Sequence, residues 1–219
     1  MIDELLGRLE ATTVKFDLGR GGLPTLTPQD IAAALGMCQD KRAAKVYQCF
    51  AGETADPKEL DFIVATIQFE EWRNRADRML EAQLAVASAD MASNGRQDAK
   101  RRAKLLMDGA KAALWPPLVE ETYAAMRKTL INELRRPKIC PVCNGRKAIK
   151  NGDLLVECLA CLGTGKAATS NRRRAVEMHI DNAAYIRTWG KVYDWTYRRI
   201  NDLIADGRAS FRKALGWAA

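Results

Sequence analysis

The feature that most restricts the fold of this chain is a set of four cysteines in two close pairs. Each pair encloses two residues, and 14 residues separate the pairs. Such a pair can present both sulfurs to one ion from a single tight turn, and zinc takes four thiolates in tetrahedral geometry. A glycine follows each pair (Gly145 and Gly163), which allows the backbone to fold back beneath a metal. The spacing predicts one structural Zn²⁺ held by Cys140, Cys143, Cys158 and Cys161.

Two other states of these cysteines stay open at this point, namely redox-active disulfides and unliganded thiols. No secretory or membrane segment is visible, because Asp3 and Glu4 follow Met1 and no uncharged run exceeds nine residues, far short of the roughly 20 that span a bilayer. We therefore expect a cytoplasmic, reducing environment, which favours metal binding over a disulfide framework. Four protein ligands leave no open coordination position, so the expected metal is structural.

The charge of the chain is concentrated in its last third. Residues 1–137 carry 20 basic and 20 acidic side chains, whereas residues 138–219 carry 15 basic and 7 acidic ones and so account for the whole formal charge of +8. Cations gathered on one surface attract polyanions. This distribution favours nucleic-acid binding over action on small molecules, and a solvated basic face is the alternative explanation.

Apolar residues in the first 137 positions recur at helical spacing. We expect helices from Thr27 as N-cap and Pro28 to near Gly36, then over 41–50, 56–89, 97–114 and 118–134. Residues 139–165 differ, with glycines and short β-forming runs. The expected fold class is mainly α: a helical body, an inserted four-cysteine zinc-binding β-hairpin and a helix-turn-helix-like pair. The expected divisions are an N-terminal segment (1–25) whose glycines favour mobility, the helical body (26–137), the hairpin (138–168) and a basic helical segment (169–219).

The basic segment contains two expected helices joined by a tight turn. A short helix reaches Ile180, Asp181-Asn182 form the turn, and a longer helix covers about 183–204. This order is typical of a helix-turn-helix, whose second helix enters the major groove. Ordinary helix packing is the alternative, with an aromatic stripe as core. The expected stripe consists of Ile186, Trp189, Tyr193, Tyr197, Ile200 and Ile204.

Basic side chains around this pair are the candidate DNA contacts. Arg187 and Lys191 are the best placed to read bases, where one bidentate contact to guanine is worth roughly 1–3 kcal/mol. Thr188 and Arg198 lie on the same expected face. Phosphate contacts that set the register are expected from Lys166, Arg172, Arg173 and Arg174.

The remaining cysteines and the single histidine indicate no further site. Cys38 and Cys49 fall among apolar neighbours in expected helices and are predicted to be packing residues. His179 has no second histidine or carboxylate cluster at ligand spacing, and no phosphate-loop or G-x-S-x-G pattern occurs. We therefore expect a protein that is not an enzyme, has no small-molecule substrate and does not enter a membrane.

The cysteine region resembles the late-gene antitermination protein Q of lambdoid bacteriophages. The likeness rests on Cys-x2-Cys-Asn-Gly-Arg, the β-forming run, Cys-x2-Cys-Leu-Gly-Thr-Gly and the helix pair that ends in Trp189-Gly-Lys-Val-Tyr193. Upstream, residues 26–37 and 47–52 also look like that family. The resemblance extends over roughly 25–200 and is most specific around the cysteines.

This resemblance implies a function that the spacing alone does not. Q proteins bind DNA within the late promoter, engage paused host RNA polymerase holoenzyme that retains sigma factor, and travel with it through terminators. By this likeness the four cysteines are the zinc ligands, the helix pair belongs to the double-stranded DNA surface, the helical body contacts polymerase, and the protein works in the bacterial host cytoplasm.

Two rival functions remain. C-x2-C-x-G-x-G is also the repeat of the DnaJ cysteine-rich domain, which makes a zinc chaperone module the first rival. That domain usually has four repeats, and this chain has two, one of them degenerate. The second rival is a phage DNA-processing protein, a nuclease or resolvase with structural zinc, although the chain has no acidic cluster for a catalytic metal.

Overall fold

The computed structural model describes residues 28–51, 56–91, 97–135, 137–151, 154–161, 163, 165–167 and 169–216. The expected N-terminal segment over 1–25 and the expected N-cap Thr27 lie outside these residues. The described chain is mainly helical, with one antiparallel pair of strands. The elements are α2 (Pro28–Met37), α3 (Lys41–Ala51), α4 (Pro57–Met91), α5 (Gln97–Ala113), α6 (Glu120–Arg135), β1 (Ala148–Asn151), β2 (Leu154–Glu157), α7 (Asn171–Glu177), α8 (Asn182–Ala184), η2 (Tyr185–Trp189) and α9 (Gly190–Ala214).

Local polar signals place the starts of these helices. The Asp40 carboxylate accepts from the N–H of Ala43 at the start of α3, and Asp56 accepts from the N–H of Lys58 at the start of α4. Ser170 and Asp181 cap α7 and α8 in the same way. Each cap satisfies an N–H that the first helical turn leaves without a partner. The expected helices of the body are confirmed to within a few residues at their ends.

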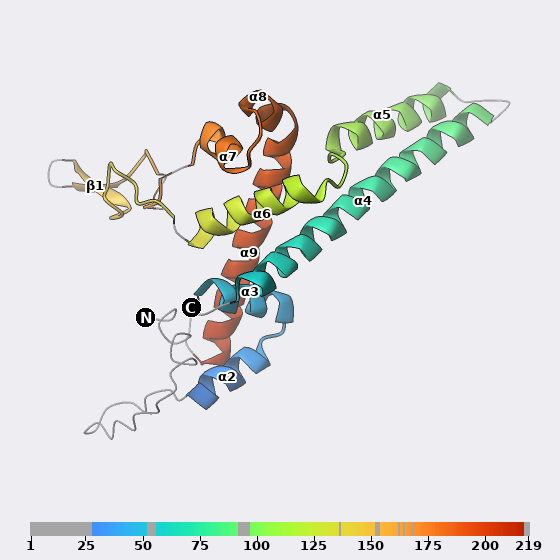
Figure 1. The fold of residues 1–219 in the computed structure, drawn as a ribbon. Coiled ribbons are helices and arrows are strands. Elements are labelled where there is room, and N and C mark those ends of the chain that lie inside the picture. Colours follow the sequence, from blue (N-terminus) through green and yellow to red (C-terminus); the bar gives the residue numbers. More distant parts are fainter. Residues whose placement is uncertain are drawn as a thin grey trace, which may run out of the picture.

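Helix α9 is the axis of the fold (Figure 1), running from the α7–α8 end of the molecule to α2. Its first half packs against α6 and α7, and its second half packs against α3 and α2. The main core draws on both sides of the cysteine region, with Leu60, Val64, Tyr123, Met126, Leu130, Ala175, Tyr185, Tyr193, Ile200 and Leu203 buried together. The described residues of the helical body and of the basic helical segment therefore contribute to one shared core.

The crossing of α9 and α3 is unusually close at Gly207. A Cβ atom at this position would lie 2.2 Å from the carbonyl oxygen of Ala43 and 2.7 Å from Cβ of Tyr47. Only a residue without a side chain fits there. Next to this crossing the Tyr47 and Phe211 rings pack with centroids 5.9 Å apart, so the C-terminal end of α9 is held firmly on α3.

Helices α4 and α5 form an antiparallel arm that projects from the core (Figure 1). Small residues, Ala82 and Ala89 on α4 and Ala103 on α5, are buried along it. Large apolar side chains remain exposed along α4 at spacings of 7, 11, 4 and 7 residues, which place them on one face of a helix. They are Phe62, Phe69, Leu80, Leu84 and Met91.

The helix that follows Asp181 differs from the expected one in its register. Residues 185–189 form a π turn, in which the N–H of Gly190 bonds to the carbonyl of Tyr185. A π turn adds one residue to the helical repeat, so the side chains before it rotate by about one position. The expected stripe is therefore wrong at its start: Ile186 is 58% exposed, and Tyr185 is fully buried in its place. From Tyr193 to Ile204 the stripe faces the core as expected.

Candidate metal centre and basic surface

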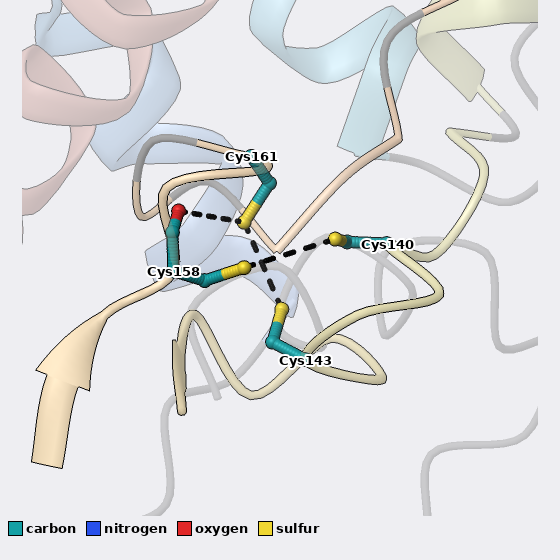
Figure 2. Close-up of side chains that lie close together, drawn as sticks. All are labelled: Cys140, Cys143, Cys158 and Cys161. Carbon is teal, nitrogen blue, oxygen red and sulfur yellow. Dashed lines mark hydrogen bonds between the residues drawn. The ribbon is translucent and has the colours of Figure 1, made fainter. Parts of the chain in front are cut away.

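The four paired cysteines converge in one buried cluster (Figure 2). Their sulfur atoms all lie within 4.8 Å of one another, with Cys140 Sγ 4.0 Å from Cys158 Sγ and Cys143 Sγ 3.7 Å from Cys161 Sγ. Four sulfurs at about 2.3 Å from a central ion would be about 3.8 Å apart in a tetrahedron. The cluster therefore has the size of a four-thiolate metal site, and all four cysteines are free thiols in this structure.

The backbone around the cluster depends on glycines at left-handed positions. Gly163 and Gly165 have φ angles of 68° and 74°. A Cβ at Gly165 would lie 2.8 Å from the carbonyl oxygen of Gly145, so this position combines a strained conformation with a close backbone approach. Between the two turns β1 and β2 pair antiparallel, with Ala148 opposite Glu157 and Asn151 opposite Leu154. The hairpin brings the second cysteine pair back over the first.

Backbone N–H groups point at the sulfurs. The N–H of Gly165 donates to Cys161 Sγ at 3.3 Å, and the N–H of Cys143 is the main cause that lowers the pKa of Cys140 to about 7. Burial raises the pKa of Cys158 to about 11. A bound cation favours the thiolate form of its ligands. A metal in the cluster would therefore favour deprotonation of both Cys140 and Cys158, although their pKa values differ without it.

The two ends of the cysteine module are held side by side in what we call the stem, residues 137–140 and 165–167. Ile139 and Lys166 form an antiparallel bridge. The N–H of Cys140 donates to the carbonyl of Gly165, and the N–H of Ala167 donates to the carbonyl of Lys138. Among the described residues, Ile149 is the hydrophobic side chain that packs on the cysteines. So small a core does not stabilise a hairpin by itself, and a metal bound to the four cysteines would supply most of its stability.

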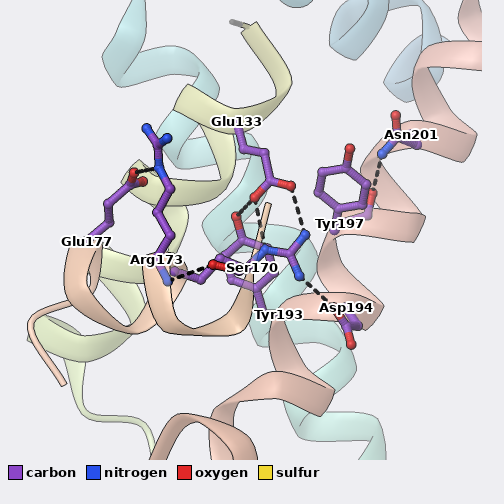
Figure 3. Close-up of polar contacts among 9 residues, drawn as sticks. Glu133, Ser170, Arg173, Glu177, Tyr193, Asp194, Tyr197 and Asn201 are labelled. Atoms are coloured by element: carbon purple, nitrogen blue, oxygen red, sulfur yellow. Dashed lines mark hydrogen bonds and ion pairs between the residues drawn. The ribbon is translucent and has the colours of Figure 1, made fainter. Parts of the chain in front are cut away.

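Arg174, one of the predicted DNA contacts, has a side chain that is largely buried. Its guanidinium makes two bonds to Glu133, Nη2 to Oε1 at 2.7 Å and Nε to Oε2 at 3.0 Å, and a third to Asp194 at 3.2 Å. The same Glu133 accepts from the hydroxyl of Tyr193 at 2.7 Å (Figure 3). The guanidinium carbon lies 4.4 Å from the centroid of the Tyr193 ring. These contacts join α6, α7 and α9.

The titration behaviour of this cluster follows from its burial. Burial alone would lower the pKa of Arg174, but the hydrogen bond and charge of Glu133 raise it above the ordinary value. Burial and the bond to Glu133 raise the pKa of Tyr193. Arg174 is therefore a charged structural residue, and its expected phosphate contact is corrected: the guanidinium is satisfied inside the protein.

Four of the other predicted DNA contacts line two hollows, to which the Arg174 cluster contributes Glu133 and Asp194. The first, the α9 groove, has a volume of about 710 Å³ and includes Lys191 and Arg198, with Arg75, Asn171, Ile186, Asp194, Trp195, Arg199 and Asp202 also in its lining. The second, the stem hollow, has a volume of about 560 Å³ and includes Lys166 and Arg173. These four residues are thus divided between two hollows.

Three candidates, Arg172, Arg187 and Thr188, line neither hollow, and Lys191 and Arg173 each have a partner within the protein. Arg187 is exposed on η2, and its Nε donates to the carbonyl of Ala183. Thr188 is half-buried, and Arg172 is exposed on α7. Lys191 Nζ donates to the carbonyl of Ala112 at 3.4 Å, which joins α9 to the C-terminal end of α5. Arg173 donates to Glu177 on the same helix at 2.7 Å.

Two packing predictions from the sequence can be compared with the structure. Cys38 and Cys49 are each 2% exposed, which confirms them as packing residues.

His179 is exposed and occupies a left-handed position with φ 56° just after α7. The N–H groups of His179 and Ile180 bond back to the carbonyls of Val176 and Ala175. This is a Schellman ending, which usually takes glycine.

Residues that sequence reasoning did not single out complete the basic surface. Lys128 and Lys138 line the stem hollow. Lys138 lies shortly before the first cysteine and Lys166 shortly after the last. Because a closed metal module brings its two ends together, the predicted zinc site also indicates that these two lysines lie near one another. Lys128 reaches the stem hollow because of how α6 packs in the fold, and no local sequence pattern indicates that packing.

No family model, curated protein or solved structure matches this chain. In the described part of the chain, no helix is both long enough and apolar enough to cross a membrane.

Proposed function

We propose that this protein is a DNA-binding transcription antitermination factor of the phage Q type, with one Zn²⁺ in the four-cysteine cluster. It would bind double-stranded DNA at a site within a late promoter, load onto host RNA polymerase holoenzyme that retains sigma factor, and allow read-through of terminators. The observation that carries the proposal is the direct succession of a four-thiolate cluster and the basic α7–α9 pair. The motif resemblance supports the same assignment.

Two features of the structure support the division of labour between DNA and polymerase. Lys191 and Arg198 line the α9 groove, and exposed Arg187 lies on the adjoining π turn; π turns are frequent at functional sites. The α4 face, in contrast, exposes large apolar side chains, among them Phe69 and Leu84. Exposed apolar surface of this kind is typical of a site for a protein partner.

In vitro transcription tests the function directly. The template carries the native late promoter and a downstream terminator, with host polymerase holoenzyme. We expect added protein to raise terminator read-through, and we expect deletion of the promoter segment that binds the protein to abolish the effect. Unchanged read-through would overturn the proposal. Metal analysis of the purified protein should give one zinc per chain, and a different metal would overturn the assignment of the ion.

One observation favours the chaperone rival as a second candidate. The cysteine module exposes Val142, Leu154, Leu155 and Leu159, and Leu155 is 80% exposed. Apolar side chains on a zinc module could bind unfolded segments. An aggregation assay with a denatured reporter protein separates the two functions, because an antitermination factor should not suppress aggregation at stoichiometric concentration.

A further inference from the structure

The stem hollow collects positive charge from three parts of the chain. Lys128 comes from α6, Lys138 and Lys166 from the stem, and Arg173 from α7. All four side chains belong to exposed residues. The polar residues Thr129, Asn132 and Thr169 also belong to its lining.

The two carboxylates in the lining are balanced from within the protein. Glu133 accepts from Arg174, and Glu177 accepts from Arg173. Lys128 and Lys138 therefore add positive charge that these two ion pairs do not offset. At this size and with this lining, the hollow suits a chain of phosphates better than a buried apolar ligand.

We infer that the stem hollow binds backbone phosphates of double-stranded DNA, as a second contact region in addition to the α9 groove. The inference rests on the proposed DNA-binding function and extends it by naming Lys128 and Lys138 as contacts. Phosphate contacts fix the position of a protein on the duplex and carry no base specificity.

This assignment also gives the cysteine module a defined task. The Ile139–Lys166 bridge and the Ala167–Lys138 bond place Lys138 and Lys166 on adjacent strands at the edge of the hollow. The cysteine cluster adjoins the stem, because Cys140 belongs to both and its N–H donates to the carbonyl of Gly165. A closed metal site would thus hold two lysines at a fixed separation, and loss of the metal would release them.

The test is the salt dependence of duplex binding by the full chain. Fluorescence anisotropy with a mixed-sequence duplex of about 30 base pairs, between about 50 and 200 mM NaCl, gives the slope of log K against log salt. Each lost phosphate contact should reduce the slope by about 0.9. We expect that reduction for Lys128→Ala, roughly twice that for Lys128→Ala/Lys138→Ala, and no change for Lys128→Arg/Lys138→Arg.

Lys104→Ala is the matched control, because Lys104 is an exposed lysine on α5, on the projecting arm. Zinc content and thermal melting verify that each variant is folded. Wild-type slopes in the lysine variants, together with reduced slopes in Arg187→Ala and Arg198→Ala, would overturn the stem-hollow site and leave the proposed function intact. Wild-type slopes with lost read-through would instead assign the hollow to an acidic protein partner. A wild-type protein that binds no duplex would overturn both proposals.

Discussion

Arg174 and Glu133 form a bidentate ion pair in which each side chain is only 12% exposed, with N···O distances of 2.7 and 3.0 Å. The pair joins α7 to α6, and the bond from Tyr193 to the same carboxylate adds α9. The carboxylate of Glu133 thus joins the three helices α6, α7 and α9. Removing a partner from such a pair leaves a buried charge without compensation.

The first prediction concerns this pair. Arg174→Ala should lower the free energy of unfolding by about 3–5 kcal/mol, because Glu133 would remain buried without its cation. Arg172→Ala, the exposed neighbour, should change stability by no more than about 0.5 kcal/mol. Urea denaturation of both variants measures the difference. Equal stabilities would show that the Arg174 side chain is not needed for packing.

The second prediction tests the close crossing of α9 and α3. Gly207→Ala would force a methyl group to within 2.2 Å of the carbonyl oxygen of Ala43, and the helices would have to separate. We expect a loss of about 1–3 kcal/mol, the usual cost of overpacking. Gly109→Ala on α5 is the control, since nothing lies within 4 Å of its Cβ position. It should stabilise by up to about 1 kcal/mol, and both effects can be read from denaturation curves.

The third prediction concerns the turn between α7 and α8. Because His179 has a positive φ at the position after the helix end, glycine should be better accommodated there. His179→Gly should raise the free energy of unfolding by about 1 kcal/mol, whereas the β-branched His179→Val should lower it. Thermal melting distinguishes the two. A lower free energy of unfolding for His179→Gly than for the wild type would mean that the imidazole makes a contact worth more than the backbone strain.

The sequence was most informative where a single local rule decides the structure. The cysteine spacing predicted the cluster, and the apolar periodicity together with Pro28 and Asp56-Pro57 predicted the helices of the body to within a few residues of their ends. Periodicity failed at Ile186, because the π turn shifts the register and a repeat of 3.6 residues cannot reveal such an insertion. Arg174 was assigned to DNA because its partner Glu133 is 41 residues away in the sequence, and long-range pairing has no local signature.

The fourth prediction separates the metal module from the helical core. The cysteine cluster and the main core are distinct hydrophobic clusters. A chelator should therefore release one metal ion per chain and abolish hydrogen-exchange protection in β1 and β2, while the helical circular dichroism signal stays near its original value. The same result is expected for Cys158→Ser, and Cys38→Ala should retain the metal, since Cys38 is packed in another cluster. Loss of most helical signal on chelation would contradict this separation.

The fifth prediction distinguishes base reading from phosphate contact among the exposed arginines. Arg187 lies on the π turn beside the α9 groove, whereas Arg173 lines the stem hollow. Arg187→Ala should relax preference at one base position, at a cost of roughly 1–3 kcal/mol on the specific site. Arg173→Ala should weaken binding to all sequences by a similar factor and reduce the salt slope by about 1. Binding to the promoter site and to random duplexes, measured for both variants at several salt concentrations, gives the answer. If both substitutions weaken specific and random binding equally, Arg187 is a backbone contact and the second helix does not read bases through it.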